Sequence, residues 1–164
     1  MGNPNEQIRQ LREALKLSPT NVPLRRALAE ALLGAGLAAE AVTEFSAALK
    51  AAPEDLEIKT GLARAFFAEG KASHALVVVE DIVRNEAAPA RAFVLHARLL
   101  AGMGEIEQAV EQYKRGVGKD RTAADYDFAT RFGIRTAPEP KTLPGLTETI
   151  FSPDGLGHDT VMPP

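Results

Sequence analysis

Residues 27–48 read ALAEALLGAGLAAEAVTEFSAA, and the arrangement of small and apolar residues in this stretch occurs three times in the chain. Residues 61–82 read GLARAFFAEGKASHALVVVEDI and residues 95–116 read LHARLLAGMGEIEQAVEQYKRG, so successive copies begin 34 residues apart. Five sets of positions keep this spacing: Ala29, Ala63 and Ala97; Leu32, Phe66 and Leu100; Gly36, Gly70 and Gly104; Ala41, Ala75 and Ala109; and Phe45, Val79 and Tyr113. A fixed period of this length is typical of stacked helical repeats and not of a catalytic domain.

Proline, glycine and capping residues divide the chain into short predicted helices. Asn3, followed by Pro4 and Glu6, has the pattern of an N-cap, a first-turn proline and a capping-box acid. Asn21 and Asp55 are placed to cap two further helices. The predicted helices cover about residues 4–16, 22–33, 39–51, 56–68, 73–85, 89–101, 105–116 and 123–132. Helices of this length joined by short loops favour antiparallel pairs.

Residues 136–164 depart from this pattern, because their prolines leave no stretch that can sustain a helix. The segment carries the whole charge deficit of the chain, with one lysine and four acids, whereas residues 1–136 hold 18 basic and 18 acidic residues. Its apolar residues are too many for an inert spacer: Leu143, Leu146, Ile150, Phe151, Leu156, Val161 and Met162. We predict an irregular, Pro-rich acidic tail or linker of a composition common in segments that order on a surface.

Composition and charge exclude several classes of function. The chain has 164 residues and a formal net charge of -3, so bulk attraction to nucleic acid or to an anionic membrane is not expected. It contains no cysteine, which excludes disulfides, thiolate metal sites and thiol catalysis. The polar N-terminus lacks a signal-peptide pattern, and no apolar run is long enough to span a membrane. We therefore expect a soluble, cytoplasmic protein.

The 34-residue unit resembles the tetratricopeptide repeat, a pair of antiparallel helices with small residues where the two helices touch. Residues 22–55 agree with the family at every preferred position: Leu28, Ala29, Leu32, Gly36, Ala41, Phe45, Ala48 and Pro53. Residues 56–89 depart only at Ile82 and Ala87, and residues 90–123 depart at His96, Gly116 and Arg121. Residues 4–19 resemble the second helix of a partial repeat.

This resemblance implies an all-α fold, an α-solenoid of antiparallel helix pairs with about three repeats and flanking helices. The predicted array covers residues 3–135. The first helix and a capping helix at about residues 123–132 would close its ends, with Tyr126 and Phe128 packing on the last repeat.

Arrays of this family usually bind peptides in a concave groove lined by the first helix of each repeat. The positions that the resemblance places in this groove are Arg26, Glu30, Leu33, Thr60, Arg64, Phe67, Arg91, Val94 and Arg98. Arginine forks recognise carboxylates, and Leu33 with Phe67 would form an apolar floor, so we expect a protein or peptide partner that is acidic and has an apolar anchor. The alternative is a solvated arginine row that Glu30 and Glu57 offset.

Other kinds of site have little support in the sequence. Some family members clamp a chaperone's terminal carboxylate with Lys and Asn, but the corresponding positions hold Arg26, Glu30, Gly61, Arg91 and Leu95, without an Asn. His96 occupies a packing position, so we expect it in the core, and no histidine pair has the spacing of metal ligands. Neither Ser46 nor Ser73 has a His and an acid arranged around it. We expect no enzyme, no metal and no cofactor.

Several functional hypotheses stay open. The first is a protein-binding adaptor whose groove receives a partner segment, and the second is a scaffold that self-associates through its third repeat or its tail. The chain could instead be the N-terminal interaction module of a larger enzyme, such as an ATPase, with the tail as a linker. A further hypothesis places residues 137–164 in the chain's own groove or in a neighbour's, because the tail is acidic and carries apolar residues.

Overall fold

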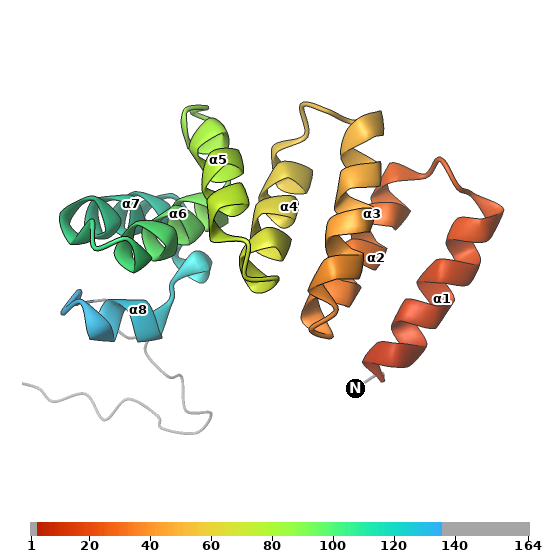
Figure 1. Cartoon of the computed structure of the whole chain (residues 1–164), viewed down its shortest axis with the longest axis horizontal. Helices are drawn as coiled ribbons and strands as arrows, with labels where there is room; N and C mark the ends of the chain where they lie inside the picture. Colours follow the sequence, from red (N-terminus) through yellow and green to blue (C-terminus); the bar gives the residue numbers. More distant parts are fainter. Residues whose placement is uncertain (1–2, 136–164) are drawn as a thin grey trace, which may run out of the picture.

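The computed structural model describes residues 3–135, and within that range every regular element is helical (Figure 1). The elements are α1 (Pro4–Leu17), α2 (Val22–Gly34), α3 (Ala38–Ala51), α4 (Leu56–Ala68), α5 (Ala72–Val83), α6 (Ala90–Gly102), α7 (Ile106–Lys119), a 3-10 turn (Arg121–Ala123) and α8 (Tyr126–Arg131). The predicted all-α solenoid is confirmed. The predicted tail, residues 136–164, lies outside the described residues.

The helices begin where the sequence places capping residues. The side chain of Asn3 accepts a hydrogen bond from the Asn5 amide, and that of Asn21 accepts one from the Leu24 amide. Asp55 accepts from two amides of the first turn of α4. The capping box predicted at Glu6 is wrong, because the Glu6 carboxylate accepts hydrogen bonds from the side chains of Arg9 and Gln10.

Each repeat turns between its two helices at a glycine. Gly36, Gly70 and Gly104 have φ values of 78°, 83° and 87°, a left-handed conformation that side chains with a Cβ rarely adopt. After Gly36 the amide of Leu37 reaches back to the carbonyl of Leu32 at 2.9 Å, which satisfies one free carbonyl at the end of α2. The same turn at each glycine makes the helix pairs equivalent.

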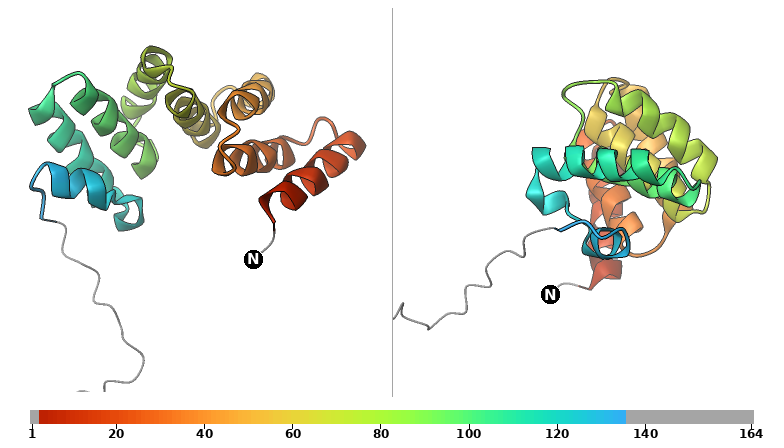
Figure 2. Two further views of the ribbon diagram at one scale, coloured as in Figure 1. Left: turned by 60° about the horizontal axis from the view of Figure 1, so that its bottom comes forward. Right: turned by 90° about the vertical axis from the view of Figure 1, so that its left-hand side faces the viewer.

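The pairs α2–α3, α4–α5 and α6–α7 stack side by side, and together with α1 and α8 they form an arch (Figure 2). The first helices of the pairs contact one another, α2 with α4 and α4 with α6. The face formed by α2, α4 and α6 is called the groove below. The repeated alanines let the backbones approach closely, since Ala29, Ala63 and Ala97 have no exposed surface.

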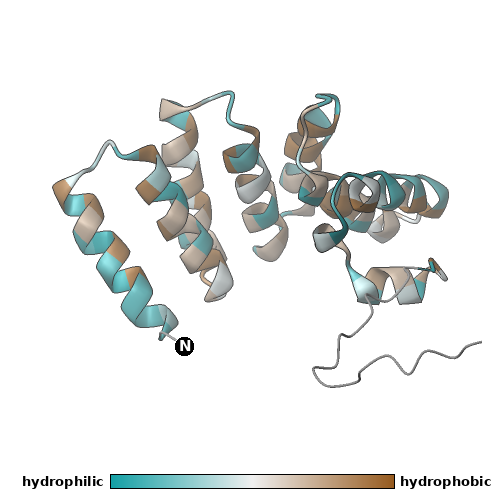
Figure 3. Cartoon of the chain, turned by 180° about the vertical axis from the view of Figure 1, so that it is seen from behind, coloured by the Kyte–Doolittle hydropathy of each residue, from teal (hydrophilic) through white to brown (hydrophobic). Residues whose placement is uncertain are grey.

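Apolar side chains at the repeated positions fill the interior between the pairs. Phe45, Val79 and Tyr113 are buried at equivalent places in the three pairs. Two helices are more polar than the rest: α1 and α7 carry many hydrophilic residues (Figure 3). Terminal elements of a solenoid need a polar outer face, because no further repeat covers them.

The C-terminal cap differs from the predicted helix over residues 123–132. Residues 120–125, called the connector below, form a 3-10 turn and an extended stretch, and α8 begins only at Tyr126. Asp125 causes this late start, because its carboxylate caps α8 by accepting from the Phe128 amide. Phe128 stacks on Tyr113 with ring centroids 4.9 Å apart, as expected for a cap. The expectation that Tyr126 also packs there is wrong, since its side chain is 55% exposed.

Candidate functional site

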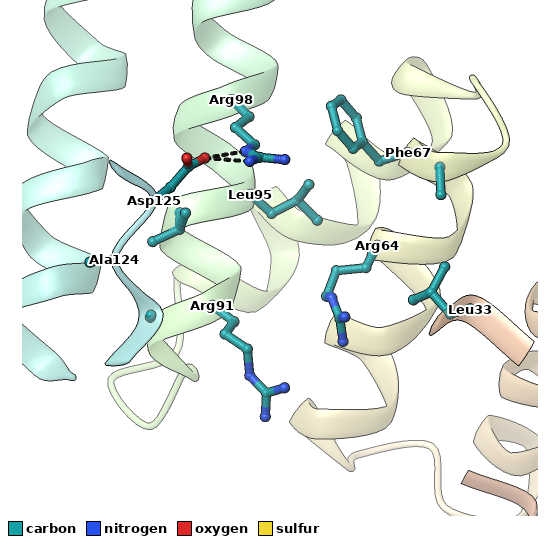
Figure 4. Close-up of a pocket in the computed structure, with 11 residues that line it drawn as sticks. Leu33, Arg64, Phe67, Arg91, Leu95, Arg98, Ala124 and Asp125 are labelled. Carbon is teal, nitrogen blue, oxygen red and sulfur yellow. Dashed lines mark hydrogen bonds and ion pairs between the residues drawn. The ribbon is translucent and has the colours of Figure 1, made fainter. Parts of the chain in front are cut away.

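A hollow of about 400 Å³ lies in the groove between α4 and α6, and the connector forms its far wall (Figure 4). Its lining is Leu33, Arg64, Phe67, Ala68, Arg91, Val94, Leu95, Arg98, Ala123, Ala124 and Asp125. Six of these are residues that the repeat register predicts for the groove: Leu33, Arg64, Phe67, Arg91, Val94 and Arg98. The helices α2, α4 and α6 thus bring together residues that are far apart in the sequence.

The floor of this hollow is apolar. Leu33 and Phe67 are half-buried and face it, as their repeat positions predict. Leu95 completes the floor, and its side chain is 5% exposed. Val94 lines the hollow although it is also part of the core. Half-buried leucine and phenylalanine side chains leave apolar area in water, which a partner's side chain can cover.

Two of the groove arginines pair with acids that stand one repeat earlier. The Arg64 guanidinium lies 3.0 Å from the Glu30 carboxylate, and Arg91 lies 3.5 Å from Glu57. Both pairs join residues 34 positions apart, so they connect first helices of adjacent repeats. The arginine row is therefore partly neutralised within the array.

The third arginine holds the connector. Arg98 donates to the carboxylate of Asp125, whose side chain is only 11% exposed. The phenol of Tyr113 both donates to the Asp125 carbonyl and accepts from its amide, at 3.0 and 3.1 Å. Burial alone would raise the pKa of Asp125, but the hydrogen bonds from Arg98 and the Phe128 amide outweigh it and lower that pKa. The Asp125 side chain is therefore ionised where it lines the hollow.

Arg26 lies apart from the apolar hollow. It is exposed and lines a separate polar recess of about 500 Å³ with Glu30, Glu57 and Arg91. Arg91 borders both spaces, so the recess continues the groove toward α2. Two arginines and two glutamates alternate there, which gives the recess no net charge.

Thr60 does not line the groove, in contrast to the expectation from its repeat position. Its side chain is 2% exposed, and its hydroxyl donates to the carbonyl of Leu56 at 2.7 Å. A threonine inside a helix commonly bonds back to the preceding turn, and here this bond satisfies a hydroxyl that has no access to water. Thr60 is therefore a core residue of α4.

Sequence reasoning did not assign the connector to the groove. Ala123, Ala124 and Asp125 carry no repeat signal, because they follow the last full pair and belong to no equivalent position. The family resemblance gives Leu95 only as a position of the carboxylate clamp, although it lies one residue after Val94 and lines the same hollow. The sequence contains one sign of the role of Asp125. It stands three residues before Phe128, where an acid can cap the start of a helix.

The histidine in the core and two searches over the described residues complete the description of the site. His96 is buried, as predicted, and burial lowers its pKa, while the Arg115 charge acts in the same direction and Glu80 opposes it. Within residues 3–135 no three side chains of His, Asp or Glu come together as metal ligands do. None of the helices in this range is both long and apolar enough to cross a membrane.

Comparisons with known proteins agree with this geometry. A family model described as the tetratricopeptide repeat matches residues 1–65 and 32–98. MamA from Desulfovibrio magneticus RS-1, from residue 41 to its end, is 24% identical with a TM-score of 0.66, over 80% of this chain and 73% of that one. A thermophilic repeat protein of Thermus thermophilus is 16% identical with a TM-score of 0.61, over 77% and 69%. No curated protein sequence matches.

At these sequence identities, the likeness to the solved structures shows a shared fold and nothing beyond it. The family match covers most of the described helices, and the Gly turns and small-residue contacts of the structure recur with its period. Arrays with this architecture present extended surfaces to other proteins. The chain belongs to the tetratricopeptide repeat family, and its fold is that of a protein-interaction scaffold.

Proposed function

We propose that the chain is a non-enzymatic adaptor that holds a segment of a partner protein in its groove. The observation that carries this proposal is the apolar hollow of Leu33, Phe67 and Leu95 beside the guanidinium groups of Arg64 and Arg98. An apolar side chain that fills such a hollow contributes roughly 1.5–3 kcal/mol. The groove thus suits a segment with one apolar anchor.

The charge of the groove further limits which kind of partner segment fits it. Four arginines (Arg26, Arg64, Arg91 and Arg98) stand against three carboxylates (Glu30, Glu57 and Asp125), which leaves a net charge of +1. Toward the residues that the structure describes, Arg64 uses only its Nη1, in the bonds to Glu30, so its other donors can bind a partner's carboxylate. We infer that the anchor supplies most of the affinity, and that acidic residues beside it set its orientation.

A pull-down from lysate, analysed by mass spectrometry, tests this proposal with two kinds of groove variant. Arg64→Glu with Arg98→Glu reverses the charge of the two arginines that form the rim of the hollow. Leu33→Ser with Phe67→Ser replaces two of the three apolar floor residues and keeps every charge. Arg12→Glu with Arg25→Glu is the matched control, because both arginines form ion pairs outside the hollow. Circular dichroism confirms that each variant is helical.

A prey that wild type and the control retain, and that both groove variants lose, supports the adaptor. The same preys on all four proteins would place the binding surface elsewhere and contradict the groove. Measuring the affinity at several salt concentrations separates the contribution of the arginine rim from that of the apolar floor. A partner held chiefly by its apolar anchor loses little affinity as the ionic strength rises.

Self-association is a second candidate, favoured by apolar residues at the turn between α6 and α7. Met103 is 61% exposed and Ile106 is 40% exposed, and both belong to the third helix pair. Light scattering over a range of protein concentrations tests this alternative, and a constant monomer mass excludes it. The cytoplasmic location stays a prediction from the sequence.

A further inference from the structure

We propose that residues 141–156 of this chain bind in its own apolar hollow, so that an outside partner must displace them. The sequence of this segment is KTLPGLTETIFSPDGL. The inference rests on the proposed function, because both use the same groove. It identifies an internal competitor for that groove and thereby a regulation of partner binding.

The described chain brings its C-terminal end to the hollow. The connector lines the hollow, and α8 follows it directly, held by the Arg98–Asp125 ion pair and by the stacking of Phe128 on Tyr113. From Asp125, α8 and the four residues after it span at most about 20–25 Å. The sixteen residues from 136 to Phe151 extend up to about 50 Å. The chain is therefore long enough to return from Arg135 to the hollow.

The segment has the chemistry that the groove requires. Phe151 is a large apolar side chain, and Glu148 and Asp154 flank it at three residues on either side. In a polyproline II conformation, which has three residues per turn, the three side chains lie on the same side of the segment, and each carboxylate stands about 9 Å along it from the phenylalanine. Phe151 on the floor of the hollow would thus leave one carboxylate for each side of the arginine rim.

Charge favours the same pairing. Residues 141–156 carry one Lys and two acids, a net charge of -1, whereas the groove carries +1 by the count above. Within residues 3–135, most apolar residues at the repeat positions are already buried in the core. Complementary charge makes the encounter favourable and orients the segment.

Because residues 141–156 are covalently attached to the array, a weak interaction is enough for them to occupy the groove. A short tether gives an effective concentration in the millimolar range, so a segment that would bind with a Kd of about 0.1 mM as a free peptide occupies its own groove about nine-tenths of the time. The apparent affinity for an outside ligand of the groove then falls about tenfold, because only the unoccupied fraction binds it.

Spin labelling tests the contact directly, because the chain contains no cysteine and a single one can be introduced. Ser152→Cys, one residue after Phe151, carries a nitroxide in full-length, isotope-labelled protein. We expect the amide signals of Leu33, Phe67 and Leu95 to lose most of their intensity, and those of Val77 on α5 to keep theirs. Adding Phe151→Ser to the labelled chain should restore the groove signals.

Mixing separates a contact within one chain from a contact between two chains. Spin-labelled protein without isotopes is mixed with isotope-labelled protein without the nitroxide. Broadening of groove signals in the mixture, at the level of the single sample, would mean that a second copy supplies the segment and would overturn the proposal. Unbroadened groove signals in both samples would overturn it as well.

A binding measurement gives an independent readout. The probe is a fluorescent synthetic peptide of residues 141–156, and its anisotropy is followed with full-length wild type, with Phe151→Ser and with the control Met162→Ser. We expect Phe151→Ser to bind the probe about tenfold more tightly than wild type, since its own segment competes poorly. Equal affinity of all three proteins would contradict the inference.

The outcomes for the two proposals are distinguishable. If the groove signals stay sharp but the variants of Leu33 and Phe67 still lose a prey, the adaptor stands and only the internal competitor fails. If the groove signals broaden but every prey is retained, the tail contact stands and the groove is not the partner site.

Discussion

The guanidinium of Arg64 lies 3.0 Å from the carboxylate of Glu30, which stands on the preceding repeat. Arg91 and Glu57, which stand at a different repeat position, form a similar pair between the next two first helices, at 3.5 Å. The row of arginines predicted from the sequence is thus tied to a row of acids by the stacking of the repeats. The groove offers apolar area and spare guanidinium donors, and little excess charge.

Exchanging the two charges separates the role of this pair in stability from a role in binding. Arg64→Glu alone places two carboxylates together, and we expect it to cost about 0.2–1 kcal/mol of the free energy of unfolding, since both groups are partly exposed. Adding Glu30→Arg restores the pair and most of the stability, as measured by urea unfolding. Partner binding should stay weak in the double variant, because the guanidinium then projects from α2. Recovery of binding together with stability would show that Arg64 serves the fold alone.

Gly61 is required because the ring of Phe45 occupies the space of its missing side chain. A Cβ at Gly61 would overlap Cε1 and Cζ of this ring, which is fully buried. We expect Gly61→Ala to destabilise the protein by about 1–3 kcal/mol, the usual cost of overpacking a core. Gly118→Ala on α7 is the control, because a Cβ there meets nothing within 4 Å. It should be neutral or stabilising by up to about 1 kcal/mol in thermal unfolding. Equal melting temperatures for the two variants would contradict this packing.

His96 is 8% exposed, and neither ring nitrogen forms a well-aligned hydrogen bond with a described residue, although the Gln112 side chain lies close enough to act on its pKa. The equivalent positions in the first two repeats hold Leu28 and Leu62. We expect His96→Leu to stabilise the chain by about 1–3 kcal/mol, because it removes two buried polar atoms that lack a well-aligned hydrogen bond.

The stabilisation by His96→Leu should also depend on pH. Burial lowers the pKa of His96 in the folded chain below 6.5, so the unfolded chain takes up a proton first as the pH falls. Wild type therefore loses stability from about pH 6.5 downward, until the folded pKa is reached, and the leucine variant lacks this loss. Urea unfolding at pH 8 and at pH 5 should show a larger gain for the variant at pH 5. A gain that is the same at both values would contradict a buried, neutral imidazole.

Asp125 stabilises the connector through two kinds of bond. Asp125→Ala removes the cap of α8 and the partner of Arg98, and we expect a loss of about 0.5–2 kcal/mol from the cap alone. Asp125→Asn keeps a capping oxygen and loses the charge, so it should cost less. Asp127→Asn, at an exposed residue of the same helix, is the control. Hydrogen exchange of the α8 amides measures the local effect.

Acid should abolish the difference between wild type and Asp125→Asn. The folded pKa of Asp125 lies below its ordinary value of 3.8, so the carboxylate stabilises the folded chain at higher pH and ceases to do so as the pH falls through the folded pKa. The two proteins should have distinct stabilities at pH 6 and similar ones near pH 2–3. A difference that persists unchanged in acid would show that the charge of Asp125 contributes nothing.

Much of the fold is predictable because each repeat is specified locally. The caps at Asn3, Asn21 and Asp55 act as predicted, since a side chain and an amide two or three residues away need no tertiary contact. The turns at Gly36 and its equivalents follow from the left-handed conformation that glycine tolerates. The helix predicted over residues 123–132 was wrong in its first residues, because no second copy of the pattern marks where the cap begins.

The candidate site was less predictable than the fold, and two residues show why. Repeat position puts Thr60 beside Arg26 in the groove, but position does not reveal that its hydroxyl bonds to Leu56 and that its surroundings close over it. Asp125 has no repeat position, and it reaches Arg98 only because the chain folds back against α6 and α7 after the last pair. Each case depends on how elements meet, which a periodic pattern does not encode.

The sequence by itself determined the stack of antiparallel helix pairs, because small residues, glycine turns and caps act within one repeat or between neighbours. Tertiary structure alone decided which arginines are paired, that Gly61 accommodates the Phe45 ring, and that the connector walls the hollow. These features depend on the angle between successive pairs and on the path of the chain after the last one. Both result from packing over the whole array, and no local pattern of residues specifies them.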